Sequence, residues 1–456
     1  MNSRIKFNRH LLHPWADLPS LGEDEGTPLI TRGEGVYVYD DQGRKFLDGP
    51  GGMWCMQVGY GRKEIADAIS TQALDLSYAS AFSVMHPKEI ELATRIAEVT
   101  PGDLNRIFFT TGGSTAVDSA LRLCQLANNI KGQQNRKHIL CREQGYHGST
   151  FLAASVTGKE RDKSLLDTEK DLVHFLTSPL LSADPLKRSE QDFCDFLIEE
   201  LDQAILEIGP ENIMCFIAEP VLGSGGVVVP PKDYNRRAWE VVKGYGIIYI
   251  ADEVVTGFGR LGHWFVSKEI YGVQPDIITF AKGVTSGYLP LGGFAVSDSF
   301  VSEISHDKAD GNLFSAGFTW SANPICCAAA LTSWDILERE NILEHVKEIG
   351  PYFQNQLKTL EDHELVREVR GIGLMAAVEL EAPDKISGES LLDRDYTLGD
   401  LVDRHCYELG LMVRPLINIC ILSPPLVISF EQVDELIEKL AAGIQAAYRE
   451  LGEPKS

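Results

Sequence analysis

The hydrophobic and polar positions of this chain repeat with two different periods. Short apolar runs, rich in β-branched residues, predict strands that are buried on both faces. They occupy residues 107–110, 138–141, 213–218, 247–251 and 277–281. Segments with apolar residues at helical spacing lie between them, at 63–76, 88–99, 193–208 and 234–244. Strands that alternate with helices in this way predict βαβ units, and therefore an α/β fold with a mainly parallel sheet.

The two ends of the chain depart from this alternation. Residues 36–39 and 46–47 predict a hairpin about an Asp-Asp-Gln-Gly turn, and the proline-punctuated residues before it predict an extended arm. Residues 159–192 are polar and predict an irregular surface segment. From about residue 328 onward, a long helix, strand-like pieces and amphipathic helices up to Tyr448 predict a smaller C-terminal domain.

The length of the chain, 456 residues, is too great for one compact unit. We expect residues 1–55 to form an N-terminal arm and part of a small domain. Residues 56–320 are expected to form a large cofactor-binding domain, and residues 321–456 the rest of the small domain. A hydrophobic content of 44% with 24% charged residues is ordinary for a soluble protein.

The charge and the cysteines exclude several classes of partner. A formal net charge of −24 disfavours nucleic acid and anionic membranes, since both would repel the protein. Nine scattered cysteines without a Cys-x-x-Cys pair indicate free thiols in a reducing compartment. The N-terminal segment has no apolar core of a signal peptide, and no run reaches the length of a membrane span. We therefore expect a cytoplasmic protein, with no metal site.

An acid and a lysine follow two of the predicted strands. Asp252 ends the run 247–251, and Lys282 follows the run 277–281, thirty residues later (282 − 252). Ligands of open α/β sheets bind at the carboxyl ends of strands. Either residue alone is more often a helix cap or a solvated loop residue. Together they suit pyridoxal phosphate, which needs a lysine to bind its aldehyde and a carboxylate to keep its ring nitrogen protonated.

Two further strand ends carry residues that suit the same cofactor. Gly112 and Gly113 precede a predicted helix with Ser114 as its expected N-cap, and amides at a helix N-terminus after two glycines can bind a phosphate. A lone Gly-Gly-Ser is weak evidence, because turns use it constantly. Glu219 is a third acid at a strand end, after residues 213–218.

The stretch ADEVVTGFGRLG, followed by PDIITFAKG, closely resembles the signature of class III, pyridoxal-phosphate-dependent aminotransferases of the ω-transaminase group. This resemblance extends over nearly the whole chain. It implies fold type I, in which a mainly parallel seven-stranded sheet flanked by helices forms the large domain, beside a smaller α+β domain. The chain departs from the commoner phosphate-loop form Ser-Gly-Ser-Glu at Gly112 and Thr115. We expect phosphate binding to survive, because backbone amides do most of the work.

The resemblance also implies roles for individual residues. Lys282 and Asp252 are the expected catalytic residues. Cofactor contacts are implied for these two and for Gly113, Ser114, Tyr146, His147, Glu219, Val254 and Thr319. Substrate contacts are implied for Trp54, Phe82, Tyr146 and Arg414. Relatives that have both residues suggest that Glu219 pairs with Arg414 when no substrate carboxylate is bound. Tyr146 matches an aromatic residue on the cofactor ring, and Thr319 matches a threonine that reaches a neighbouring subunit's phosphate; an ordinary tyrosine and a helix cap are the alternatives.

These residues predict a ping-pong transfer of an amino group from an amine or ω-amino acid to a keto acid. The resemblance implies that the keto acid is pyruvate. A homodimer, or a dimer of dimers, is expected. A mutase, racemase or decarboxylase of the same fold would use the same Lys282 and Asp252, and only a transaminase accumulates the aminated cofactor. A non-catalytic binding protein is a further alternative, although it would not need these residues. The sequence leaves the donor amine open.

Overall fold

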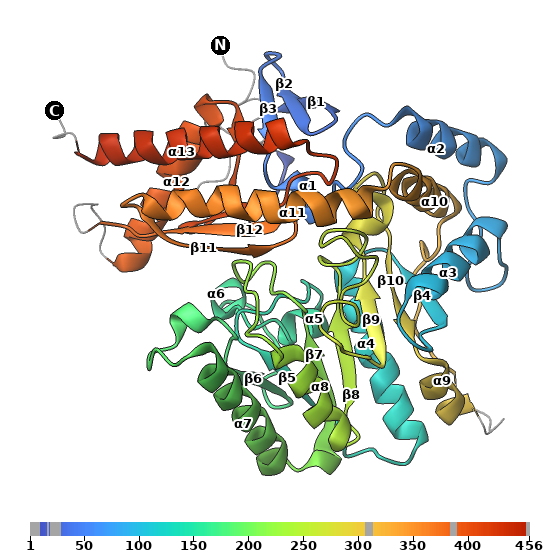
Figure 1. Ribbon diagram of the computed structural model, residues 1–456. Coiled ribbons are helices and arrows are strands. Elements are labelled where there is room, and N and C mark those ends of the chain that lie inside the picture. The colour runs from blue at the N-terminus through green and yellow to red at the C-terminus, as the bar shows by residue number, and fades with distance from the viewer. Residues whose placement is uncertain (1–9, 16–17, 19–28, 306–312, 384–389, 453–456) are drawn as a thin grey trace.

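The computed structural model describes residues 10–15, 18, 29–305, 313–383 and 390–452. The predicted N-terminal arm lies mostly outside these residues. In Figure 1 the described chain forms two parts, a sheet with flanking helices below and a helix-covered layer of strands above. The two predicted parts are therefore visible, while the domain boundaries at 55 and 320 stay a prediction.

A seven-stranded sheet organises the lower part (Figure 1). Its strands are β4 (Arg106–Thr110), β5 (His138–Arg142), β6 (Val173–Leu176), β7 (Ile213–Ala218), β8 (Ile248–Asp252), β9 (Ile277–Phe280) and β10 (Gly292–Val296). They lie in the order β4-β10-β9-β8-β7-β5-β6. Strands β5 to β9 pair in parallel, and β10 runs antiparallel to both β4 and β9. The predicted α/β fold with a mainly parallel sheet is confirmed.

Helices cover both faces of this sheet. They are α3 (Pro87–Val99), α4 (Gly113–Ile130), α5 (Phe151–Ser155), α6 (Glu160–Lys163), α7 (Glu190–Ile208), α8 (Tyr234–Gly244) and α9 (Asp298–Ser305), while α2 (Lys63–Asp75) lies to one side of the sheet. The alternation along β7 shows the two faces: Phe216 belongs to a core with α7 and α8, whereas Ile217 belongs to a core with α4. A strand buried on both sides explains the unbroken apolar runs in the sequence.

The upper part combines the N-terminal hairpin with the C-terminal third of the chain. Its strands are β1 (Ile30–Glu34), β2 (Tyr37–Asp40), β3 (Lys45–Asp48), β11 (Val366–Ile372), β12 (Met375–Leu380), β13 (Leu411–Met412), β14 (Arg414–Leu416) and β15 (Ile419–Leu422). Its helices are α1 (Gly51–Trp54), α10 (Pro324–Arg339), α11 (Ile342–Lys358), α12 (Leu391–Glu408) and α13 (Phe430–Gly452). Strand β3 pairs in parallel with β13, which joins the two ends of the chain. Helix α10 packs against α2 and α3 of the lower part and also against α11.

Two local predictions are wrong. Residues 159–192 are not wholly irregular, because β6 adds an edge strand to the large sheet beside β5. Val173 and Leu176 are buried in this four-residue strand. A strand this short does not show a recognisable pattern of apolar and polar positions in the sequence. Ser114 is not the N-cap of α4 either: the cap is Gly112, and Ser114 lies inside the first turn.

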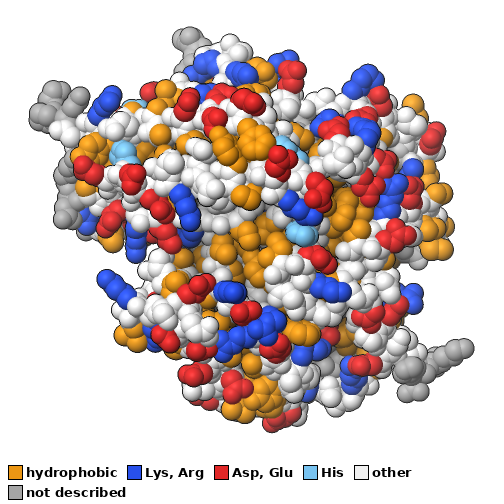
Figure 2. All heavy atoms as spheres, viewed as in Figure 1, with side chains coloured by type: hydrophobic (Ala, Val, Ile, Leu, Met, Phe, Trp, Pro, Cys, Tyr) orange, Lys and Arg blue, Asp and Glu red, His pale blue; other side chains and the backbone are white. Residues whose placement is uncertain are grey.

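The surface in Figure 2 carries acidic and basic side chains interspersed, and apolar side chains gather in the middle of this face between the upper and lower parts. No helix within the described ranges is both long enough and apolar enough to cross a membrane.

Candidate functional site

A cavity of about 280 Å³ lies at the carboxyl ends of the central strands. It is lined by nine of the residues that the sequence singled out: Gly112, Gly113, Ser114, Tyr146, His147, Glu219, Asp252, Val254 and Lys282. They come from four separate strand ends, after β4, β5, β7 and β8, and from the segment after β9. The sheet order places these ends beside one another, as expected for an open α/β sheet.

Lys282 begins the short 3-10 helix η6 (Lys282–Thr285) directly after β9. Its backbone is in the left-handed region, with φ at 41°, a conformation that a non-glycine residue adopts only under constraint. Burial lowers the pKa of the Lys282 ammonium, while the carboxylates of Asp252 and Glu219 oppose this effect. A lysine that gives up its proton more easily is a better nucleophile and a better base.

Asp252, the last residue of β8, is buried and held by three hydrogen bonds. Its Oδ1 accepts from the Thr279 hydroxyl at 3.0 Å and from the Val254 N–H at 3.1 Å. Its Oδ2 lies 2.7 Å from His147 Nδ1. A carboxylate so fixed is oriented before any ligand arrives, which is what a partner for a protonated ring nitrogen requires.

His147 is a neighbour of this carboxylate, which its position in the sequence could not show. It is buried, and its backbone N–H donates to the Thr157 hydroxyl at 3.0 Å. An ionised carboxylate only accepts, so His147 Nδ1 donates to Asp252. Thr157 and Thr279 support the site but were not among the predicted residues. Thr279 had a signal, since it is a polar residue inside a buried apolar strand.

Glu219 connects two loops at the edge of the cavity. One carboxylate oxygen accepts the N–H of Tyr146 at 2.9 Å and the other accepts the N–H of Gly223 at 2.9 Å. Burial raises the pKa of Glu219; His147 opposes this rise and Asp252 adds to it. The carboxylate therefore holds Tyr146 at the cavity wall. Among the described residues, Glu219 forms no ion pair with Arg414.

The first turn of α4 forms the opposite wall. Gly112 caps the helix without a side-chain hydrogen bond, and Gly113 and Ser114 line the cavity at the helix N-terminus, where the first amides have no partner within the helix. Ser114 Oγ accepts the N–H of Ser149 at 3.0 Å. A Cβ on Gly148, whose φ is 142°, would lie 2.6 Å from that Oγ, so only glycine lets the two segments approach this closely.

These residues fit pyridoxal phosphate. The helix amides suit its phosphate, Lys282 suits its aldehyde, and Asp252 suits its ring nitrogen. Thr115 replaces the usual glutamate of the phosphate loop, and its hydroxyl donates to the Gly112 carbonyl at 2.9 Å. This contact stays within the turn and leaves the amides available.

Four predicted residues do not line this cavity. Trp54 is buried in an apolar cluster with Val221, Val227 and Val255. Phe82 and Thr319 are exposed, and a Cβ on Gly317 would lie 3.1 Å from the Phe82 ring. Arg414, at the start of β14, is half-buried and donates to the sulfur of Met53. Its charge contributes to the lowering of the Lys282 pKa, which places its guanidinium within electrostatic reach of the cavity. The roles of these four residues stay predictions.

Other residues that line the cavity had no signal in the sequence. They are Cys55, Thr111, Ser224, Thr285 and the loop residues Leu289 to Leu291. Each lies on a short or irregular segment, where periodicity gives no information.

Comparisons with known proteins identify the family of this chain. The profile of the class III aminotransferase family matches residues 21–444. The putrescine–pyruvate aminotransferase of Pseudomonas aeruginosa is 41% identical over 430 residues, which cover 94% of this chain and 92% of that protein. The mitochondrial gamma-aminobutyrate transaminase 1 of Oryza sativa subsp. indica is 35% identical, over 94% of this chain and 83% of its own length.

Solved structures show the same fold. An (S)-enantioselective ω-transaminase from Thermomicrobium roseum superposes with a TM-score of 0.90 at 38% identity and covers 96% of each chain. A thermostable ω-transaminase variant from Pseudomonas jessenii has a TM-score of 0.92 at 32% identity, over 99% of this chain and 100% of its own. The prediction of fold type I is confirmed.

Proposed function

We propose that this chain, which belongs to the class III aminotransferase family, transfers the amino group of a primary amine or ω-amino acid to pyruvate by a ping-pong route. The protein is a transferase that depends on pyridoxal phosphate. When bound, this cofactor accepts the amino group from the donor and the electrons that are released when a proton leaves the donor carbon. The remaining steps are assigned to the chain's own residues.

The observation that carries the proposal is the placement of Lys282 and Asp252 in one cavity beside the amides of α4. Lys282 Nζ attaches the cofactor and, once released by the donor amine, removes the proton from the donor carbon as a general base. Its lowered pKa favours this role, because an ammonium cannot accept a proton. Asp252 holds the ring nitrogen protonated, and Tyr146 fixes the plane of the ring.

Arg414 is proposed to bind the carboxylate of the keto acid. A guanidinium can grip a carboxylate with two parallel hydrogen bonds, and a flexible side chain can withdraw when the bound substrate is a simple amine. Support comes from its contact with the exposed Met53 and its electrostatic influence on Lys282. The relative from Pseudomonas aeruginosa is named for putrescine and pyruvate, which makes a diamine the first donor to test.

The test is a panel of amines and ω-amino acids, assayed as separate half-reactions by absorbance of the cofactor. The expected result is stoichiometric conversion of the bound cofactor by the donor, and its return by pyruvate but not by a keto-free control. Turnover of the donor with no accumulation of the aminated cofactor would instead favour a mutase, racemase or decarboxylase.

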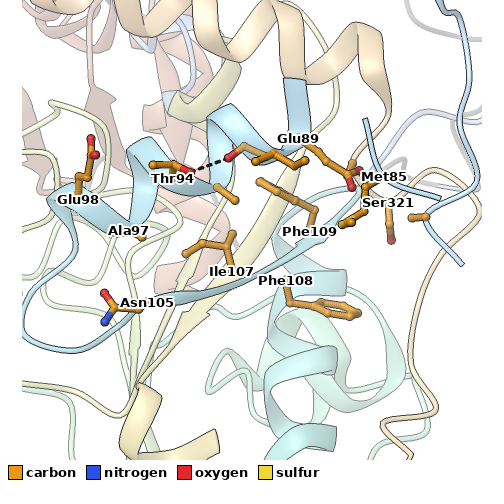
Figure 3. A pocket seen from close by; sticks show the side chains of 14 residues that line it. Met85, Glu89, Thr94, Ala97, Glu98, Asn105, Ile107, Phe108, Phe109 and Ser321 are labelled. Carbon is orange, nitrogen blue, oxygen red and sulfur yellow. Dashed lines mark hydrogen bonds between the residues drawn. The ribbon is translucent and has the colours of Figure 1, made fainter. Parts of the chain in front are cut away.

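A homodimer is part of the proposal. Phe82, Met85 and Trp320 are 69%, 76% and 59% exposed in the single chain, which is unusual for large apolar side chains that lie near one another in the fold. Figure 3 shows the groove beside them, where Met85 lies just before α3 and Ile107 and Phe109 lie on β4. Sedimentation should give a dimer. A fully active monomer at assay concentration would contradict the subunit role of Thr319.

We also propose that the enzyme works in the cytoplasm. All nine cysteines are free thiols, and eight of them are buried, as suits a reducing compartment. Fractionation of cells that produce the protein, followed by activity measurement in each fraction, tests this location.

A further inference from the structure

Arg370 connects the two parts of the molecule. It lies on β11, which forms the lower edge of the upper part in Figure 1. Its side chain is only 8% exposed, and its Nη1 pairs with Glu379 at 2.6 Å and with Glu368 at 2.9 Å. Its Nε donates to the carbonyl oxygen of Gly226 at 2.8 Å, and Gly226 belongs to the lower part. The guanidinium therefore joins a strand of one part to a loop of the other.

The loop that accepts this bond is short and closed. The backbones of Leu222 and Val228 exchange two hydrogen bonds, at 3.0 and 2.9 Å, which close the loop between them. Inside it, the N–H of Gly226 donates to the carbonyl oxygen of Gly223 at 3.1 Å. The φ of Gly226 is 102°, and a Cβ there would lie 2.9 Å from Arg370 Nη2. Glycine therefore allows both the turn and the close approach of the guanidinium.

The same loop forms part of the catalytic cavity, which Ser224 lines. The N–H of Gly223 donates to one carboxylate oxygen of Glu219 at 2.9 Å, and the other oxygen accepts the N–H of Tyr146 at 2.9 Å. Hydrogen bonds thus run in an unbroken series from Arg370 through the loop to Tyr146, and no donor–acceptor distance in the series exceeds 3.1 Å. The position of the loop therefore bears on the wall of the cavity.

The two carboxylates that pair with Arg370 each have a second partner. Glu379 also pairs with Arg367 at 3.3 Å. Glu368 also accepts the hydroxyl of Ser182 at 2.6 Å. Both carboxylates therefore keep a polar partner when the guanidinium is absent, and the loss of the ion pairs leaves neither of them isolated.

The bond to the loop is different, because Gly226 is buried and its carbonyl oxygen needs a protein donor in place of water. An acceptor that loses its donor in such a place is destabilised, and the loop relieves this by moving. We propose that Arg370 is a positioning residue, which fixes Tyr146 against the cofactor through the bond from its Nε to Gly226. This inference rests on the proposed contact between Tyr146 and the cofactor ring.

The test compares two substitutions of equal length in the holoenzyme. In Arg370→Gln, the amide nitrogen takes the place of Nε along the side chain, so the donor to Gly226 is kept and the ion pairs are lost. In Arg370→Met, a methyl group takes that place, so both are lost. The visible circular dichroism of the bound cofactor reports the orientation of its ring, and the rate of cofactor release after dilution reports how firmly it is held. Neither measurement needs an amine or a keto acid, so both are independent of the proposed reaction.

Arg370→Met should change the dichroism per bound cofactor and raise the release rate about three- to tenfold, as expected for the loss of one hydrogen bond. Arg370→Gln should keep the wild-type dichroism and a release rate within about twofold of wild type. The matched control Arg367→Met, on the same strand, removes an ion pair of Glu379 and should behave as wild type. Tyr146→Ala should also release the cofactor faster, and adding Arg370→Met to it should change little, because both act through one contact.

Equal effects of Arg370→Met and Arg370→Gln would show that the ion pairs matter and the bond to the loop does not, which overturns the proposal. A full effect of Arg370→Met in the Tyr146→Ala background also overturns it, since the arginine would then act elsewhere. Should Arg370→Met fail to fold, Arg370→Gln alone decides, because altered dichroism in that variant refutes the role of Nε.

The Tyr146→Ala variant separates this proposal from the one on which it rests. If Tyr146→Ala changes neither measurement, the ring does not lie on Tyr146, and both the placement of the cofactor and the role of Arg370 fail. If Tyr146→Ala changes both measurements while Arg370→Met changes neither, only the role of Arg370 fails.

Discussion

Replacing Arg414 by alanine tests how one cavity serves an amine and a keto acid. The guanidinium is half-buried, and burial lowers the pKa of Arg414 from its usual value, so the charge is partly stripped of water. A charge-assisted pair that loses one partner costs about 2–5 kcal/mol when it is fully buried. Because Arg414 is only partly buried, the expected loss of binding free energy lies in the lower half of this range, at about 2–3 kcal/mol.

At 1.36 kcal/mol for each factor of ten, this loss corresponds to a roughly 30- to 150-fold fall in kcat/KM for pyruvate. Stopped-flow absorbance of each half-reaction measures it, with a simple amine that has no carboxylate as the second substrate. The amine half-reaction should keep its rate within about twofold. Arg414→Lys keeps the charge but loses the planar guanidinium. Its kcat/KM for pyruvate should lie between the values of the wild type and of Arg414→Ala. Arg404→Ala is the matched control, because Arg404 pairs with Glu450 at an exposed end of α12.

Equal losses in both half-reactions would show that Arg414 supports the structure of the cavity and does not select substrates. No loss in either would show that the side chain never reaches the carboxylate. Either result refutes the assignment.

Three further predictions concern the cofactor and stability. Lys282→Ala should leave no cofactor covalently attached after borohydride reduction, and transfer should stop; mass spectrometry that finds the cofactor on the same peptide would contradict this. Asp252→Asn should keep the cofactor bound but slow transfer by at least about a hundredfold, and near-normal turnover would remove its role. Burial, reinforced by Asp400, raises the pKa of Asp403 to about 6. The folded state then binds this proton more tightly than the unfolded state, so stability is lost as pH rises from about 4 to 6. Asp403→Asn should therefore add about 1–2 kcal/mol at pH 7 and nothing at pH 3.5 in thermal unfolding, and a gain of equal size at both values would show another cause.

The sequence by itself determined five of the seven strands of the large sheet and the residue that stands at the end of each of these five. The runs that end at Asp252 and before Lys282 carry their own signal, since a strand covered on both faces must be apolar at every position. Gly112 and Gly113 mark the start of helix α4, although the extended backbone of Gly112 is one that other residues can also adopt. These local preferences sufficed to predict an α/β fold and a lysine–carboxylate site, and the resemblance to a family added the reaction.

Only the tertiary structure decided which distant residues lie beside one another. The hydrogen bond between His147 and Asp252 joins residues 105 positions apart. It can form because the order of strands in the sheet places only β7 between β5 and β8. The partner of Arg414 is Met53 and not Glu219, since strand β14 starts beside the segment that comes after β3. Strand β6 likewise depends on pairing with β5. The physical reason is the same in each case: contacts between distant segments arise from the order of strands and from packing, which neighbouring residues along the chain do not encode.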